Sequence, residues 1–431
     1  MKCCVFLTVL LITVAPAAFG QALPAAQASP ISTGFELPMT AGTLQYAVSA
    51  SESLSWGYYG ASGTSTATNL TGDLGYISTS KRDPFSAVIA GGHSWGSNSP
   101  SYSFVSLGLS QVLSAGRWTF VFSDSVNYLP GTSTSGLTGV PGVGDLGLNP
   151  VQVGPDTGQG ILTNYSDRIS NATSATIQRP ITGKTSFNAT GFYAITRFLS
   201  GSGNASGSGL DSNSVTGQGG ISHQYSTRNT LGGNYAYSYF SYPGYNFGLP
   251  TASFDSQTAS LQYIHQFTRK LSLNASAGPE WTTIGVSGSS SSLSLYADAA
   301  LAYSGKFSRA SLTYSRGTNA GDGVTAGALS DAVFFSTSRT FVRVWNCAFT
   351  SSYTHSSSLA GLAPYTFDTT LAGFQVSRAL GRSFSTFASY TLENQSSQGS
   401  AASVIDVFNG FSQVLGFGLT YAPMSIHFGH S

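Results

Sequence analysis

The feature that most constrains the fold is a series of short basic turns, each lying between two stretches in which apolar and small polar residues alternate. Such alternation, with a period of two, indicates β-strands that have one apolar face. Longer segments rich in Gly, Ser and Asn separate the same stretches at their other ends. Tight turns at one rim and long loops at the other are typical of a bacterial outer-membrane β-barrel. The eight turns are Ser80–Asp83, Ser114–Arg117, Arg179–Lys184, Ser226–Asn229, Thr268–Lys270, Ser304–Lys306, Thr337–Arg339 and Ser377–Arg382.

The low charge of the chain agrees with this fold class. Charged residues make up 8% of the chain, whereas a soluble globular domain carries roughly 25%. The formal net charge is +1, which gives no electrostatic basis for a nucleic-acid partner. No stretch beyond the N-terminus reaches the run of about 18 apolar residues that a transmembrane helix needs.

The N-terminus has the pattern of a secretory signal peptide. Lys2 supplies the positive charge, Val5–Val14 the apolar core and Ala18–Gly20 a small-x-small cleavage site, with Ala22 as a second candidate end. We therefore expect a signal peptide over 1–20, a periplasmic leader over 21–42 and the barrel over 43–431. The mature chain would keep only Cys347, which excludes an intramolecular disulfide and a cysteine-rich metal site.

The alternating stretches predict an all-β, antiparallel, up-and-down barrel of about eighteen strands, with sixteen as the alternative. Each strand is long enough for the ~9–11 residues that cross a membrane at a tilt. Closure removes the edge strands, because lipid offers unpaired backbone groups no other partner. We expect short periplasmic turns and long extracellular loops. The expected strands are 43–56, 67–79, 84–94, 101–113, 117–128, 168–179, 185–198, 213–225, 230–240, 254–267, 271–283, 291–303, 309–316, 329–337, 341–354, 366–377, 383–394 and 409–421.

Aromatic and charged residues also follow the expected strand ends. Tyr and Trp near both rims would form the aromatic girdles of a barrel. After Lys2, all Lys and Arg except Arg168, Arg197 and Arg316 lie in or beside the short turns, whereas most acids lie at the long-loop ends. This separation predicts an acidic outer mouth and a basic inner rim. The aromatic residues are Trp56, Trp118, Tyr128, Tyr225, Tyr263, Trp281, Tyr303, Tyr353, Tyr390 and Tyr421.

Segment 129–167 is the longest interruption between expected strands, and it follows the fifth strand. A loop of this length with its own Leu and Val residues is packed or functional rather than a tether. Its position resembles that of the loop that narrows general porins, so we expect a constriction, with an extracellular cap as the alternative. The candidate pore residues are Asp145, Asp156, Asp167 and Arg168.

Four further acids fall inside expected strands, namely Glu52, Asp73, Asp124 and Asp298. We expect them to face the lumen, because a charge facing lipid at mid-depth is costly. For Asp124 and Asp298, a position near the rim or at a β-bulge stays open as the alternative.

One apparent enzyme motif does not fit its context. Gly92–Gly96 reads G-x-S-x-G, but a nucleophile elbow needs a strand before it and a helix after it. Here another alternating segment follows, so we expect Gly92–Gly96 to be a hairpin loop and Ser94 not to be catalytic. The histidines show no metal-binding spacing, and we expect no cofactor and no metal site.

The mature chain resembles the uncharacterised outer-membrane β-barrel proteins of acidobacterium-like soil bacteria. The stretches that carry the resemblance are LTGVPGVGDLGLNPVQVG, GQGILTNYSDRISN, LSLNASAGPEWT, LTYSRGTNAGDGV and GRSFSTFASYTLENQ. The resemblance implies a barrel in the outer membrane with no established substrate, inserted by the outer-membrane assembly machinery. Such barrels commonly finish on an aromatic residue, whereas here Gly429–Ser431 follow Phe428 and Pro423 interrupts the last segment.

We therefore expect a passive, porin-like channel for small hydrophilic solutes, surrounded by outer-membrane lipid. The alternative is a structural or surface-interaction barrel with a plugged lumen, and a remote alternative is an outer-membrane hydrolase. The sequence does not indicate the solute or the oligomeric state.

Overall fold

The computed structural model describes residues 42–57, 64–78, 83–97, 101–129, 167–199, 210–243, 252–285, 290–321, 325–341, 344–359, 365–399 and 409–428. The predicted signal peptide and nearly all of the predicted leader lie outside these ranges. No helix within them is long and apolar enough to cross a membrane. The strands are β1 Gly42–Trp56, β2 Thr64–Ser78, β3 Phe85–Gly96, β4 Tyr102–Ala115, β5 Trp118–Leu129, β6 Arg168–Pro180, β7 Thr185–Phe198, β8 Ser212–Ser226, β9 Asn229–Tyr242, β10 Ala252–Thr268, β11 Leu271–Ile284, β12 Ser290–Ser304, β13 Ser308–Asn319, β14 Ala328–Phe341, β15 Trp345–Ser358, β16 Tyr365–Ala379, β17 Phe384–Gly399, β18 Gly410–Tyr421 and β19 Ile426–Phe428.

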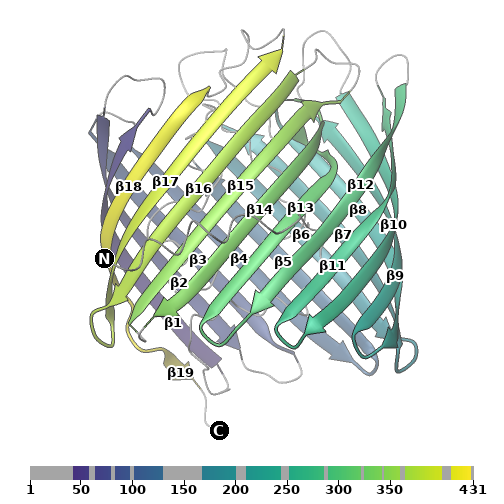
Figure 1. Cartoon of the computed structure of the whole chain (residues 1–431), viewed down its shortest axis with the longest axis horizontal. Coiled ribbons are helices and arrows are strands. Elements are labelled where there is room, and N and C mark those ends of the chain that lie inside the picture. Colours follow the sequence, from purple (N-terminus) through teal and green to yellow (C-terminus); the bar gives the residue numbers. More distant parts are fainter. Residues whose placement is uncertain are drawn as a thin grey trace.

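The strands form one closed antiparallel barrel, in which each strand pairs with the next and β18 pairs back with β1. Figure 1 shows the strands tilted across the wall. Strand ends that are joined by short turns lie at one rim, and strand ends that border the longer intervals of the sequence lie at the other. We call these the short-turn rim and the long-loop rim. The prediction of eighteen strands is confirmed, because β1–β18 are the staves of the barrel.

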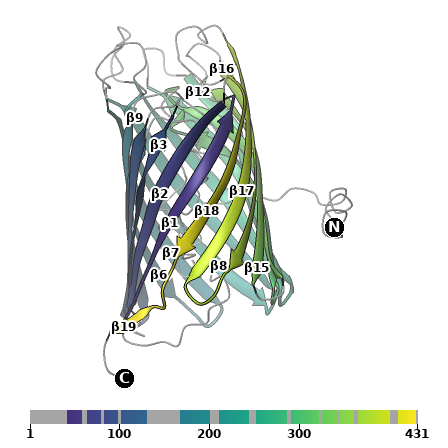
Figure 2. The same ribbon diagram turned by 90° about the vertical axis from the view of Figure 1, so that its left-hand side faces the viewer.

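The three-residue β19 continues the last stave after the interruption at Pro423. It pairs with Gly42–Leu44 of β1, on the same side of β1 as β18. Figure 2 shows β19 at the short-turn rim, below the end of β18. The aromatic Phe428 closes this ladder opposite Gly42, so the last stave is split into two strands by a residue that cannot donate a ladder hydrogen bond.

Alternate residues of each strand face opposite sides of the wall. Val48 of β1 is 45% exposed, whereas the next residue, Ser49, is 2% exposed. The exposed side carries the large apolar residues, including Leu74, Ile89 and Val215. The other side faces the lumen and carries many Ser and Thr residues together with small apolar residues and several large apolar ones, such as Phe104, Phe192 and Phe387. A closed barrel with an apolar exterior satisfies all backbone groups in lipid, and the protein is accordingly one of the outer membrane.

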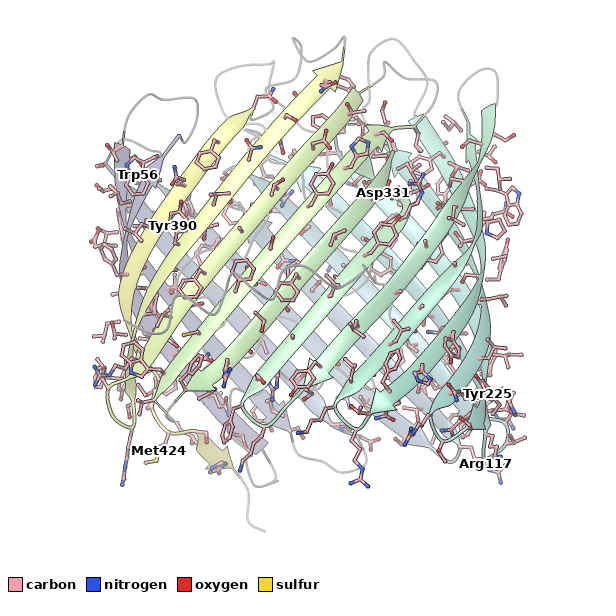
Figure 3. All side chains as sticks on the ribbon, viewed as in Figure 1. Trp56, Arg117, Tyr225, Asp331, Tyr390 and Met424 are labelled. Carbon is pink, nitrogen blue, oxygen red and sulfur yellow. The ribbon has the colours of Figure 1, made fainter. Side chains whose placement is uncertain are left out.

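The predicted aromatic girdles lie on the outward face. All ten predicted Tyr and Trp residues have outward parity in their strands. Figure 3 shows Tyr390 and Asp331 towards the long-loop rim, and Tyr225, Arg117 and Met424 towards the short-turn rim. Amphipathic rings at these two levels match the polar boundaries of a bilayer.

The aromatic rings of the two girdles have different charged partners. At the short-turn rim, cationic side chains lie over aromatic rings: Arg179 over Trp118 at 4.7 Å, Arg339 over Phe341 at 4.8 Å and Arg378 over Trp345 at 5.2 Å from the ring centroid. At the long-loop rim, tyrosine hydroxyls donate to carboxylates: Tyr128 to Asp167, Tyr314 to Asp331 and Tyr353 to Asp368. The predicted separation of charge along the barrel is present in these outward pairs.

Two local predictions are wrong. Thr337–Arg339 belong to β14 rather than to a turn, and the chain reverses between Phe341 and Trp345. Arg339 can remain in the strand because its guanidinium lies over the Phe341 ring on the outward face. Gly92–Gly96 belong to β3 rather than to a hairpin loop, and Ser94 is 2% exposed on the lumen side.

The expectation that four strand acids face the lumen is half right. Asp73 and Asp298 face the lumen and are 4% and 3% exposed. Glu52 and Asp124 instead have outward parity. The Asp124 carboxylate accepts hydrogen bonds from Thr173 Oγ1 at 2.5 Å and from Asn171 Nδ2 at 3.1 Å. These donors on the neighbouring strand compensate an outward charge that would otherwise be costly.

Candidate functional site

The four predicted pore residues are only partly described. Asp145 and Asp156 lie outside the described residues. Asp167 accepts a hydrogen bond from the outward-facing Tyr128, and its backbone carbonyl accepts one from Leu199 N at 2.7 Å. Arg168 is the first residue of β6, opposite Leu129 and Phe198. Asp167 and Arg168 therefore lie at the long-loop rim, and the role of all four residues in a constriction stays a prediction.

In the described part of the chain, a different segment extends into the lumen, at the long-loop end of β13. The β12–β13 ladder covers only Ala297–Ser304 and Arg309–Arg316. Beyond Arg316, Gly317–Asn319 remain paired with Ser330–Ala328 of β14. We call Gly317–Gly327 the inward segment, described for 317–321 and 325–327. It leaves β12 at the long-loop end and enters the lumen.

A buried carboxylate on β11 accepts a hydrogen bond from the start of the inward segment, although β12 separates β11 from β13 in the wall. Glu280 lies on the lumen face of β11 and is 3% exposed. One carboxylate oxygen accepts hydrogen bonds from Thr318 N at 3.3 Å and from Ser256 Oγ at 2.7 Å, and the other accepts from Ser294 Oγ at 3.1 Å. Glu280 thus joins the backbone of β13 to β10, β11 and β12 within the lumen.

Apolar contacts hold the tip of the inward segment. Ala320 and Ala326 belong to a buried cluster with Phe240, Tyr242, Phe254 and Leu359. Tyr242 is 1% exposed, and its hydroxyl donates a hydrogen bond to the carbonyl of Ala320 at 2.9 Å. These contacts connect β9 and β10 with the β13–β14 connection, although β13 lies four and three strands away from them around the wall. The segment therefore crosses part of the lumen.

Glycine permits two sharp reversals in this segment. Gly321 has a φ of +76° and Gly327 a φ of +97°, a region that other residues enter at a cost. A Cβ on Gly327 would also lie 2.5 Å from a ring carbon of Phe254 and 2.7 Å from a methyl carbon of Leu359. The local sequence therefore allows the chain to turn inwards and to pack closely once it is there.

Sequence reasoning missed this segment, although it left a trace. The expected strand 309–316 ends where β13 leaves β12, and the stretch LTYSRGTNAGDGV continues past that point with Gly and Ala. From the sequence, Glu280 is one of the acids expected near the long-loop ends, and its place on the lumen face, where it accepts a hydrogen bond from Thr318 N, follows only from the structure. The short interval between two strands, rich in Gly and Ala, was the only signal in the sequence.

Several other polar residues line the lumen wall. The acids on this face are Asp73, Glu280, Asp298 and Glu393, and the last is 1% exposed. Around them lie mainly hydroxyl and amide side chains, such as Ser49, Thr369 and Gln395. Within the described ranges, no group of three or more His, Cys, Asp and Glu side chains could hold a metal ion.

No family model and no curated protein sequence matches the chain. Solved structures of outer-membrane proteins are similar to it in fold. OpdQ from Pseudomonas aeruginosa is 10% identical with a TM-score of 0.41, covering 89% of this chain and 99% of that one. OccK2 (OpdF) from the same organism is 12% identical with a TM-score of 0.43, covering 89% and 98%. The FrpB iron transporter from Neisseria meningitidis is 7% identical with a TM-score of 0.40, covering 88% and 81%.

At these identities and TM-scores, the three structures carry no argument about this chain. The register of the strands establishes the closed barrel independently. The chain is an eighteen-strand antiparallel β-barrel protein of the outer membrane.

Proposed function

We propose that the protein is a passive, porin-like channel for small hydrophilic solutes. The observation that carries the proposal is the lumen face, where Ser, Thr and a few acids are frequent beside buried apolar residues, whereas large apolar residues dominate the outward face. Barrels of 16–18 strands are wide enough to leave an aqueous channel. The inward segment narrows the lumen at the long-loop rim, and segment 129–167 is a second candidate constriction.

The test is conductance. The protein would be extracted in detergent from the outer membrane of an expression host and added to a planar lipid bilayer in KCl. Discrete current steps that require the folded, heat-modifiable protein support the proposal. A folded protein that never conducts, at any voltage at which the bilayer survives, would rule out a channel.

A specific observation favours a second candidate, the plugged structural barrel. Many lumen-facing side chains are almost inaccessible to solvent, such as Thr71 at 2% and Thr369 at 1%. In a wide, water-filled lumen, such side chains would be more accessible to solvent. Electrical silence together with a folded barrel is the outcome that this candidate predicts. The resemblance to barrels of acidobacterium-like bacteria stays a prediction and adds no solute to either candidate.

A further inference from the structure

Charged side chains on the lumen face differ in sign between the rims and the middle of the wall. Arg168 is the first residue of β6 and Arg309 the second of β13, so the lumen-facing arginines of the described strands lie at the two rims. Between the rims, the charged residues of the described lumen wall are Asp73, Glu280, Asp298 and Glu393. The middle of the wall is therefore purely acidic within the described ranges.

Two of these acids have carboxylate oxygens that lack a hydrogen-bond partner. In Glu393 the oxygen without a hydrogen-bond partner is Oε2. Ser412 lies directly opposite on β18, and its Oγ also lacks a partner. Asp298 accepts a hydrogen bond from Tyr296 at Oδ2, 3.1 Å away, and Ser276 lies opposite it on β11, but no donor meets its Oδ1 with the geometry of a hydrogen bond. Both residues are at least nine-tenths buried. A buried carboxylate without compensation is costly, and a cation would supply the missing interaction.

Several acids on the outward face, in contrast, have hydrogen-bond or ion-pair partners. Asp124 has two side-chain donors, Glu52 accepts from Thr68 at 2.7 Å, and Asp331 pairs with Arg316 at 2.7 Å. Asp368 accepts from Tyr353 at 2.6 Å and contacts His355 at 2.9 Å. The chain thus supplies partners for the acids that face lipid and leaves oxygens of two lumen acids open.

We propose that the lumen is a cation path, in which Asp298 and Glu393 bind small cations: alkali ions and solutes that carry an ammonium group. Carboxylate and hydroxyl oxygens are suitable ligands for both, and rings of acids select cations in other pores. A wall of one sign raises the local concentration of counter-ions. The inference rests on the proposed channel function and specifies the solutes that the channel admits.

Reversal potentials in a KCl gradient test the selectivity. We expect K⁺ to permeate about tenfold more readily than Cl⁻, the lower end of the enrichment that such a field produces. The Asp298→Asn and Glu393→Gln variants together should reduce this ratio by roughly threefold or more, since each removes one attractive charge. Asp124→Asn is the control, because it removes a carboxylate from the middle of a strand, β5, but on the outward face. Conductance without cation preference, or an equal loss in Asp124→Asn, would overturn the inference.

A second measurement separates this inference from the proposed function. The midpoint of heat unfolding in detergent should rise with KCl concentration, since a ligand that binds only the folded state stabilises it. The rise should be smaller in Glu393→Gln and unchanged in Asp124→Asn. A silent barrel with this difference would refute the channel and retain the cation site. A silent barrel whose three forms respond equally to KCl would refute both.

Discussion

At its short-turn end β13 is an ordinary stave, hydrogen-bonded to β12 through Arg309–Arg316, whereas beyond Arg316 the same strand leaves β12 and enters the lumen. Residues 309–316 have a continuous backbone ladder on both sides. Residues 317–319 keep only the β14 ladder, and a few side-chain contacts, centred on Glu280, Tyr242 and the apolar cluster, hold the inward segment. A region that depends on few contacts opens more easily than one held by a ladder. Single substitutions should therefore affect the inward segment far more than the wall.

The largest expected effect comes from Gly327→Val. Its left-handed backbone would cost a β-branched residue about 1–3 kcal/mol, and the contact with Phe254 and Leu359 would add roughly 1–3 kcal/mol of overpacking. We expect the inward segment to be displaced and the single-channel conductance to rise. In a protein with Cys347→Ser and Ala320→Cys, adding Gly327→Val should make the introduced thiol react faster with a charged maleimide.

The matched control is Gly191→Val. Gly191 lies in β7, has no atom within 4 Å of its would-be Cβ and faces outwards. This variant should keep the conductance and the labelling rate of the parent protein. If Gly327→Val also kept both, the inward segment would not narrow the path.

Glu280→Ala should have the next largest effect. It leaves Thr318 N, Ser256 Oγ and Ser294 Oγ without their shared acceptor, and a buried donor without a partner costs about 1–3 kcal/mol. The measurements are the midpoint of urea unfolding and the conductance. Glu52→Ala, which removes an exposed outward carboxylate, should change neither. Equal effects of the two substitutions would show that Glu280 does not hold the segment.

The contrast between the two ends of β13 also marks how far the sequence could predict the fold. Strand 185–198 was predicted at its observed bounds, because alternation and the basic turn that precedes it are local signals. The turn at Thr337–Arg339 was misplaced, because a basic residue beside an aromatic one suits the end of a strand as well as a turn. The inward segment depends on Tyr242 and Ala320, which are 78 residues apart. No periodicity indicates such a contact. For the candidate site, sequence reasoning identified the acids but not which of them face the lumen, since Asp124 and Asp298 differ in their neighbours rather than in their type.

Tyr242→Phe tests the tip of the inward segment without changing its shape. It removes the hydroxyl that donates to the Ala320 carbonyl and keeps the ring in the apolar cluster. A typical hydrogen bond contributes about 0.5–1.5 kcal/mol, so the stability should fall by that amount and the conductance should fluctuate more. Tyr239→Phe, on the exposed outward face of the same strand, is the control. Identical current traces for the two variants would exclude a role for this hydrogen bond.

The smallest expected effect is at the point where β13 leaves the wall. Arg316 and Asp331 face each other there on the outward side, 2.7 Å apart, with side chains 33% and 26% exposed. Half-exposed pairs of this kind contribute about 0–1 kcal/mol, so Asp331→Asn should shift the urea midpoint only slightly. Because β14 remains paired with Gly317–Asn319, the inward segment should stay in place and the conductance should not change. A conductance change as large as that of Glu280→Ala would mean that the outward pair, rather than the lumen contacts, sets the position of the segment, and the contrast between the two ends of β13 would have to be redrawn around Arg316.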